Sequence, residues 1–386
     1  MKKISWETTV KTIHIIALHL AFGGVEKAIV NMANLFADRY NVEIISVYDM
    51  PSAPVYKIDE RVSVRYLLKD IPNRAQWHEA VKNRDVIGFI RESFKSAAIL
   101  SGKKLGVIRT IYGIKDGIII TTRHEDNLVL SAFGRSGVLK IAQLHHDHRF
   151  EKQYVEAFKN KYSNIDYFTV LTPLLKDEIS EMMKNTKTKV VCIPNFIDQI
   201  PEKVDTEKKE KTVVAAGRLH VMKRFDSLIR IFASVHERVP EWKLRIVGDG
   251  EERPKLEKLI EEYNASNYIT LVGMTDAKGV EEEMKRASIY AMTSSSEGFA
   301  FVIVEAQSCY LPVVAFDVRV GPPYLVSDGA DGFLVPDNAE KEYGDRLVEL
   351  MLDDELRKRM GEASRKQASK FSKENISKLW YELLGD

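Results

Sequence analysis

Short apolar runs alternate with segments of helical periodicity along most of this chain. In the first half, the apolar run Thr12–Leu18 leads to a glycine pair, and the apolar residues from Val25 to Phe36 then follow the spacing of one helical face. Strands joined by helices in this way form a parallel sheet that is covered on both faces. Further strands are expected at residues 42–47, 117–121, 140–144 and 167–171.

The same pattern restarts in the second half, after a break near Ile193-Pro194-Asn195. The charged stretch 202–211 is typical of a linker or a domain edge. Beyond it, strands are expected at residues 212–217, 244–247, 268–272, 289–293 and 312–316. The sequence therefore predicts an α/β protein with two doubly wound domains.

We expect an N-terminal domain at residues 1–195 and a C-terminal domain at residues 196–365. Residues 366–386 should form a C-terminal helix that crosses back to the N-terminal domain, because its apolar stripe must pack on another surface. Ligands of doubly wound sheets bind at the carboxyl ends of the strands. The chemistry is therefore expected in a cleft across which the two domains face each other.

Composition narrows the classes of function. The 386 residues exceed the ~250–300 residues at which single cores stop growing. A net charge of +1 argues against a nucleic-acid partner, which usually requires a strong basic excess. Two cysteines, Cys192 and Cys309, make a disulfide framework impossible and favour a cytoplasmic protein. No apolar run approaches the ~18–20 residues of a membrane span, and the first 22 residues do not form a secretion signal.

The most informative motif pairs Glu297 with Glu305, eight residues later. Gly298 lets the backbone approach a ligand, and the start of the following helix offers free N–H groups to an anion. The two carboxylates can then accept hydrogen bonds from hydroxyl groups at the two ends of one ligand. The alternative interpretation is a pair of solvated glutamates, as most such pairs are.

Two cations, Arg218 and Lys223, follow Gly217 at the end of a predicted strand. A planar guanidinium fork and a compact ammonium group together suit a diphosphate. Ordinary surface cations remain the alternative. The glycine pair Gly23-Gly24 allows a tight turn between the first strand and its helix, a weak signal by itself.

The run His145-His146-Asp147-His148 follows another predicted strand and invites a metal interpretation. Adjacent residues at a strand end point in different directions, and no ligand spacing of a zinc site is present. We therefore favour one histidine, His145, facing the cleft, with the other histidines solvated.

Together these motifs resemble a retaining glycosyltransferase of the GT-B fold, family 4 (glycosyltransferase group 1 type). Four elements stand in the family's order: the glycine pair Gly23-Gly24, the junction Ile193-Pro194-Asn195, the run Gly217-Arg218-Leu219 with Lys223, and the E-x7-E motif ending at Glu305. The resemblance implies two Rossmann-like domains, a donor site in the C-terminal domain and an acceptor site in the N-terminal domain. It is dense from residue 212 to 335 and thin from 53 to 115.

The resemblance also implies roles for individual residues. Arg218 and Lys223 would hold the diphosphate, Glu305 the ribose, and Glu297 the donor sugar, while His145 would face the reacting centre. Positions implied to contact the donor are Gly24, Gly298, Phe299 and Ala300, and those framing the base are Leu271, Val272, Gly273 and Met274.

Three residues depart from the family's pattern. Tyr310 and Arg224 stand where glycine is frequent, and Tyr324 stands where a glutamate is common. These departures bear on the shape of the donor pocket rather than on the fold.

The expected reaction moves a hexose or N-acetylhexosamine from a nucleoside-diphosphate sugar to a hydroxyl of a glycan, lipid or protein-linked acceptor. UDP is the expected nucleotide, and cell-surface glycan biosynthesis is the expected process. Fixed cations would stabilise the departing diphosphate. No D-x-D motif stands at a strand end, so no cofactor and no metal are expected. Retention without a nucleophile implies front-face attack, in which a donor phosphate oxygen accepts the acceptor's proton.

Two other classes stay open: a sugar-nucleotide epimerase of the GT-B fold, and a non-catalytic nucleotide-sugar-binding partner subunit. Turnover of a sugar nucleotide without acceptor would indicate the first, and no turnover at all the second. The oligomeric state is not predicted.

The stretch 82–115 interleaves cations with apolar residues. A basic amphipathic helix can lie on an anionic surface, which would make the protein peripheral on the inner face of the membrane. A helix hairpin with one solvated face is the alternative.

Overall fold

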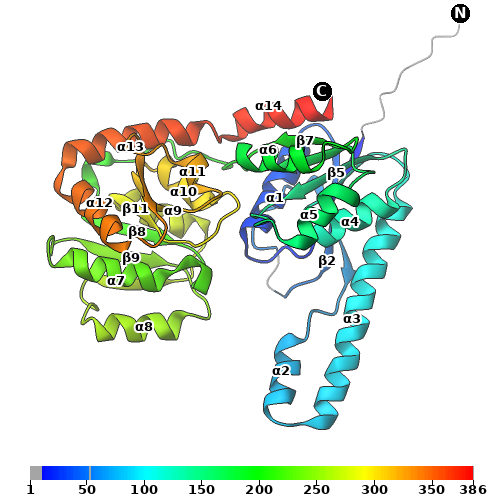
Figure 1. The fold of residues 1–386 in the computed structure, drawn as a ribbon, viewed down its shortest axis with the longest axis horizontal. Helices are drawn as coiled ribbons and strands as arrows, with labels where there is room; N and C mark the ends of the chain where they lie inside the picture. The colour runs from blue at the N-terminus through cyan, green and yellow to red at the C-terminus, as the bar shows by residue number, and fades with distance from the viewer. Residues whose placement is uncertain (1–10, 52–53, 386) are drawn as a thin grey trace, which may run out of the picture. The chain divides into compact units, whose positions relative to one another are not determined.

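The computed structural model describes residues 11–51 and 54–385. Over this part, the chain divides into two units: unit 1 runs to Val170 and includes Leu175–Cys192, and unit 2 comprises Leu171–Leu174 and the chain from Ile193 onward. Each unit contains one parallel β-sheet with helices (Figure 1). The expected class, α/β with two doubly wound domains, is confirmed.

The sheet of unit 1 has seven strands in the order β3-β2-β1-β4-β5-β6-β7, and all neighbouring pairs are parallel. Its strands are β1 (Thr12–Ala17), β2 (Asn41–Tyr48), β3 (Val62–Leu68), β4 (Ile118–Thr121), β5 (Leu139–Leu144), β6 (Tyr167–Val170) and β7 (Lys189–Cys192). The central strands are buried on both faces, as continuous apolar runs predict.

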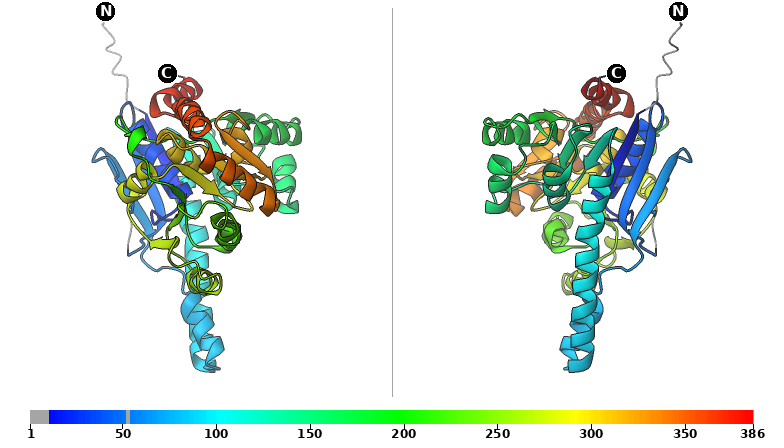
Figure 2. Two further views of the ribbon diagram at one scale, coloured as in Figure 1. Left: turned by 90° about the vertical axis from the view of Figure 1, so that its left-hand side faces the viewer. Right: turned by 90° about the vertical axis from the view of Figure 1, so that its right-hand side faces the viewer.

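The helices of this half connect the strands. They are α1 (Gly24–Phe36), α2 (Arg74–Lys82), α3 (Val86–Gly113), α4 (His124–Phe133), α5 (Lys152–Asn160) and α6 (Pro173–Met182). Helices α2 and α3 form a long hairpin between β3 and β4, and Figure 2 shows α3 extending well beyond the sheet of unit 1.

Unit 2 contains a six-stranded parallel sheet in the order β10-β9-β8-β11-β12-β13. Its strands are β8 (Thr212–Ala216), β9 (Lys243–Val247), β10 (Ile269–Gly273), β11 (Ile289–Met292), β12 (Val313–Asp317) and β13 (Gly332–Pro336). Its helices are α7 (Phe225–His236), α8 (Arg253–Glu262), α9 (Ala277–Arg286), α10 (Phe301–Ser308), α11 (Pro322–Leu325), α12 (Glu340–Leu352), α13 (Asp354–Ser369) and α14 (Lys373–Leu384).

The order of the strands locates the functional edge of each sheet. In unit 1 the chain passes from β3, at one edge, back to β4 beside β1, and in unit 2 it passes from β10 back to β11 beside β8. The loops after β1 and β4, and those after β8 and β11, therefore flank the two topological switch points, where doubly wound sheets bind ligands.

Strands β3, β7 and β13 were not predicted. Strand β3 is an edge strand in which only Val62 is buried and the polar residues Ser63 and Arg65 are exposed, so it lacks the continuous apolar run used to find the others. Strands β7 and β13 are also edge strands: β7 lies at the edge opposite β3, and β13 at the edge opposite β10.

Candidate functional site

Two motifs predicted from separate parts of the sequence meet at the switch point of unit 2. The amide N–H of Ser295 donates to the Met222 carbonyl at 2.8 Å, and the Thr293 hydroxyl donates to the carbonyls of Lys223 and Arg224 at 3.0 Å each. The loop after β8 and the loop after β11 are thus hydrogen-bonded to each other. This contact positions Lys223, one of the two expected diphosphate-binding cations, beside the E-x7-E motif.

Lys223 forms an ion pair with Glu297, with Nζ 2.5 Å from Oε1. The lysine side chain is 26% exposed and the glutamate side chain 11%. The lysine passes over Gly217, where a Cβ would lie 3.4 Å from its Cε. Gly321 packs closely against Glu297, since a Cβ at Gly321 would lie 2.9 Å from the Glu297 Cβ. These contacts fix an ammonium group at the end of β8, where it can bind an anion.

Arg218 lies in a more open setting. Its side chain is 65% exposed, and its Nη2 lies 3.0 Å from the Glu251 carboxylate. His220 Nε2 lies 3.6 Å from the same carboxylate, while its Nδ1 accepts a hydrogen bond from the Met222 amide. Exposed ion pairs of this kind contribute only ~0–1 kcal/mol. Arg218 can therefore exchange Glu251 for a ligand anion at small cost.

Glu305 stands on α10, which begins after Ala300 in the left-handed conformation, with φ 63°. On the neighbouring strand β11, Tyr290 is a buried phenol whose hydroxyl donates to the Ala216 carbonyl at 3.4 Å. Burial raises the pKa of Tyr290, and the negative charges of Glu297 and Glu305 raise it further. Both carboxylates therefore act on one side chain at this edge of the sheet.

The loop that precedes α10 is anchored by aromatic packing. Phe299 is buried, and its ring lies 5.7 Å from that of Phe301 and 5.4 Å from that of Phe371, which lies between α13 and α14. Tyr324 contacts the same ring of Phe371 at 5.6 Å. This aromatic packing thus holds in place the backbone of Gly298, Phe299 and Ala300, which is expected to contact the donor.

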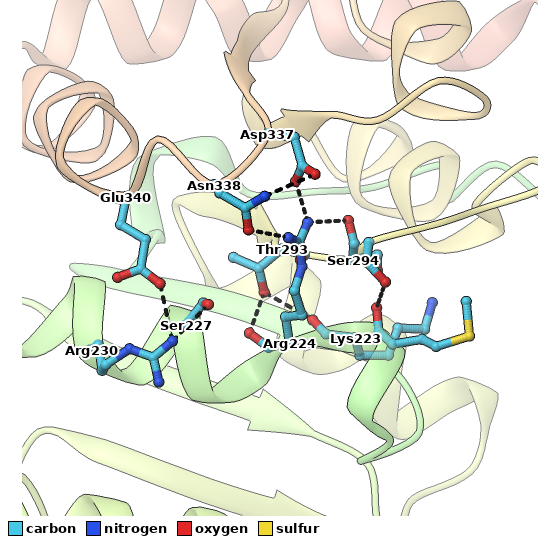
Figure 3. A network of polar contacts seen from close by, with 11 residues as sticks. Lys223, Arg224, Ser227, Arg230, Thr293, Ser294, Asp337, Asn338 and Glu340 are labelled. Carbon is cyan, nitrogen blue, oxygen red and sulfur yellow. Dashed lines mark hydrogen bonds and ion pairs between the residues drawn. The ribbon is translucent and has the colours of Figure 1, made fainter.

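Arg224 ties the two loops to the end of β13 (Figure 3). Its Nε donates to the Thr293 carbonyl at 2.8 Å, and its Nη2 donates to the Ser294 carbonyl at 3.1 Å and to Asp337 at 2.5 Å. Its Nη1 donates to Asn338 at 2.6 Å. This arginine was expected to matter only as a departure from a frequent glycine.

Both departures from glycine fall on left-handed backbone. Arg224 has φ 47° and Tyr310 has φ 60°, a region that favours glycine. Each side chain makes contacts that a glycine would lack: Arg224 forms the network above, and the Tyr310 ring lies 5.2 Å from the Arg365 guanidinium carbon. A departure at a usual glycine is therefore the sequence signal that could have identified these two structural residues.

The residues expected to frame the base lie at the end of β10. Gly273 has φ 91°, and its carbonyl accepts a hydrogen bond from the Gly248 amide at 2.9 Å. Gly248 itself approaches the backbone so closely that a Cβ would lie 2.0 Å from the Gly217 carbonyl oxygen. Leu271 and Val272 are half-buried, whereas Met274 is exposed. The ends of β8, β9 and β10 thus form one continuous edge.

In unit 1, the glycine pair lies between β1 and α1 as expected, with Gly24 the first residue of the helix. The Glu26 side chain folds back over Gly23, where a Cβ would lie 2.0 Å from Glu26 Oε2. Glu26 also lies 3.4 Å from His19 Nδ1, and burial raises its pKa. A carboxylate at this turn, which the sequence analysis did not single out, would repel an anion from Gly24 unless protonated or paired.

The histidine run after β5 divides into three environments. The His145 Nε2 lies 3.3 Å from Gln143 Oε1, and burial lowers the pKa of His145 to about 4, so this ring is neutral near pH 7. His146 is exposed and contacts the Tyr154 hydroxyl at 2.7 Å. His148 is fully buried and lies 3.1 Å from Glu178, so the expectation that the other histidines are solvated is wrong for His148. Within the described residues, no three His, Cys, Asp or Glu side chains gather as a metal-binding group.

A buried carboxyl group near the switch point of unit 1 was missed by the sequence analysis. Asp126 stands in the first turn of α4, is 2% exposed, and burial raises its pKa to about 6. The Oδ2 of Asp126 and the Nε of Arg123 are buried without a hydrogen-bond partner. A single Asp after a strand carries no sequence signal, because its depth depends on packing.

Asp126→Asn should stabilise the protein near neutral pH but not in acid. The folded-state pKa, about 6, exceeds the ordinary value of 3.8, so the protonated form favours folding, and this contribution is lost as pH rises through 6. The substitution should raise the free energy of unfolding by about 2–3 kcal/mol at pH 7.5 and change it little at pH 4. Urea unfolding at the two pH values measures this, and an equal effect at both would contradict the buried-acid interpretation.

Comparisons with known proteins agree with this arrangement. Residues 196–367 match the family model described as glycosyl transferases group 1. An exopolysaccharide phosphotransferase of Streptomyces coelicolor is 29% identical over 94% of this chain, which spans only 39% of that protein's length. The amylovoran biosynthesis glycosyltransferase AmsD of Erwinia amylovora is 26% identical over 76% of this chain and 67% of its own length.

Solved structures share the fold. The G117R mutant of S. aureus TarM, in complex with fondaparinux, α-GlcNAc-glycerol and UDP, matches 97% of this chain and 100% of its own with a TM-score of 0.76 and 18% identity. The pneumococcal O-GlcNAc transferase GtfA, in complex with UDP and GlcNAc, matches 97% of this chain and 99% of its own with a TM-score of 0.74 and 17% identity. The fold is therefore that of the GT-B glycosyltransferases.

Proposed function

Since residues 196–367 carry the glycosyl transferases group 1 match, we propose that this chain moves a hexose or N-acetylhexosamine from a nucleoside-diphosphate sugar to a hydroxyl of a glycan, lipid or protein-linked acceptor. The observation that carries the proposal is the Lys223–Glu297 pair at the joined ends of β8 and β11. The pair combines a fixed cation for the leaving diphosphate with a carboxylate for the hydroxyls of the sugar.

In this proposal the residues of unit 2 divide the donor between them. Lys223 contacts the diphosphate and stabilises the charge that grows as the glycosidic bond breaks, the term that usually contributes most to catalysis. Arg218 turns from Glu251 to the same group, and Glu305 accepts hydrogen bonds from the ribose. The end of β10, from Leu271 to Met274, lies beside the base.

We propose UDP as the nucleotide and retention as the outcome. The support for UDP is its presence in the complexes of TarM and GtfA, which share only the fold with this chain. The acceptor hydroxyl would attack the face that the diphosphate leaves, and its proton would pass to a phosphate oxygen of the departing group. His145, whose ring is neutral, would face the reacting centre without adding charge.

Glu305→Ala should weaken donor binding about 10–100-fold, because a carboxylate that accepts hydroxyl hydrogen bonds contributes ~1.5–3 kcal/mol. Nucleotide sugars are first screened by thermal shift, and titration calorimetry then compares the selected donor on the wild type and the variant. Glu251→Ala, at an exposed carboxylate paired with Arg218, is the matched control and should keep most of the affinity. Wild-type affinity in Glu305→Ala would contradict the ribose role.

The same donor tests the reaction itself. Release of the nucleoside diphosphate should be slow without an acceptor and faster with a glycan or glycolipid hydroxyl. Conversion of the donor to an epimer would instead support an epimerase, and complete inactivity with tight donor binding would support a binding subunit.

A further inference from the structure

The α2–α3 hairpin of unit 1 contributes no residue to the candidate sites, yet it is a firmly built element. Asn73, ahead of α2, donates to the Glu92 carbonyl at 2.9 Å and to its carboxylate at 2.7 Å, and accepts from the Ser96 hydroxyl at 2.7 Å. The Trp77 indole donates to Ser93 at 3.0 Å. These bonds join the two helices, so the surface that they present is preformed.

A stripe of large apolar side chains lies exposed along α3. Ile87 is 81% exposed and Phe94 is 74% exposed, although both are side chains that folding ordinarily buries. Ile87, Ile90, Phe94, Leu105 and Tyr112 follow one helical face, and the opposite face carries the buried residues. The other exposed apolar residues of the hairpin are Val81, Val86, Phe89 and Leu100.

The hairpin also carries a charge opposite to that of the rest of the chain. Residues 74–115 contain nine Lys or Arg and three Asp or Glu, a net charge of +6. The remaining chain contains 48 Lys or Arg and 53 Asp or Glu, a net charge of −5. The acidic groups Asp85 and Glu92 are engaged within the hairpin, since Asp85 caps α3 and Glu92 binds Asn73. The exposed surface is therefore both apolar and strongly basic.

We propose that this hairpin docks on an anionic phospholipid bilayer, with α3 lying in the interface and its apolar stripe among the acyl chains. On a helical projection, Arg91, Lys95 and Arg109 border the stripe on one side and Lys104 on the other, so cations meet lipid phosphates where apolar residues enter. Among the described helices, none is long and apolar enough to cross a bilayer. The attachment is accordingly interfacial.

Charge favours a bilayer over a second copy of the chain. Two hairpins packed along their stripes would place two charges of +6 side by side, and the repulsion would oppose the apolar contact. The stripe from Ile87 to Tyr112 runs straight along one helix for ~38 Å, at 1.5 Å per residue. A straight stripe of this length can lie along the flat surface of a bilayer. The inference is independent of the proposed reaction, since it rests on residues outside the donor site.

Co-sedimentation of the full chain with vesicles tests the inference. At low salt, vesicles of phosphatidylcholine with about 30 mol % phosphatidylglycerol should bind at least ten times more protein than phosphatidylcholine alone, and 0.5 M salt should release most of it. Two double variants, R91E/K95E and I87S/F94S, should each lower binding at least tenfold while donor binding stays at the wild-type value. The matched control K208E/K258E reverses two exposed lysines elsewhere, with the same change of net charge, and should keep wild-type binding.

Three results would overturn the inference. One is equal binding to both kinds of vesicle, and another is undiminished binding by both hairpin variants. The third is a dimer by light scattering that I87S/F94S converts to a monomer, because it would show a second copy on the stripe. Circular dichroism of both variants checks that the hairpin remains folded.

Discussion

Replacing Lys223 by alanine should lower the turnover of the donor about 10²–10³-fold, the range seen when a preorganised group that stabilises developing charge is removed. The reason is positional: Glu297 holds the ammonium group with Nζ 2.5 Å from Oε1, on a loop bonded to the neighbouring strand end. Charge that develops on the departing diphosphate would lose a fixed cation. Steady-state release of the nucleoside diphosphate measures the loss.

Two controls separate catalysis from folding. Lys223→Ala leaves a partly buried Glu297 without its cation, so a thermal melt must accompany the kinetics. Lys223→Arg keeps the charge and should recover part of the rate, though not all, since the guanidinium differs in shape. A rate within threefold of the wild type in Lys223→Ala, with the fold intact, would remove the diphosphate role.

Arg224→Ala should destabilise unit 2 by about 3 kcal/mol. The side chain is only 16% exposed, and its loss leaves the buried Thr293 and Ser294 carbonyls without a donor, each costing ~1–3 kcal/mol. Its stacking on Phe316, with the guanidinium carbon 5.0 Å from the ring centre, is lost as well. Urea unfolding followed by circular dichroism measures the change.

Arg224→Gly is the informative partner of this variant. It removes the same side chain but relieves a backbone with φ 47°, so its loss of stability should be smaller by about 1 kcal/mol. Equal destabilisation of the two variants would mean that the left-handed conformation costs nothing here. If Arg224→Ala left the free energy of unfolding unchanged, the network would contribute nothing to stability.

The fold was predictable where burial imposed a continuous apolar run. The central strands β1, β4, β8 and β11 all follow such runs, and the parallel sheets result from them. The edge strand β3 was not found, because only Val62 is fully buried there and most of the other residues are half-buried, which leaves no clear pattern. Apolar sequence patterns reflect burial, and the edge strands of a sheet are only partly buried, so their patterns are weaker.

The candidate site was predictable in its residue types but not in its pairings. Arg218, Lys223, Glu297 and Glu305 could be named from spacing and family resemblance. That Lys223 binds Glu297, 74 positions away, and that Arg218 binds Glu251 depends on which strands are neighbours. The buried Asp126 was missed for the same reason, since only the packed structure shows that its carboxyl is excluded from water.

Phe371 connects the end of the chain to the loop that would hold the donor sugar. Its ring contacts Phe299 and Tyr324, and its carbonyl accepts from the Ile197 amide at 3.1 Å. The C-terminal segment thus supports this loop through direct packing. A truncation that removed Phe371, or a rigid fusion partner attached next to it, would shift the loop proposed to hold the donor sugar. Binding of the sugar would then be impaired even though every polar residue of the donor site stayed in place.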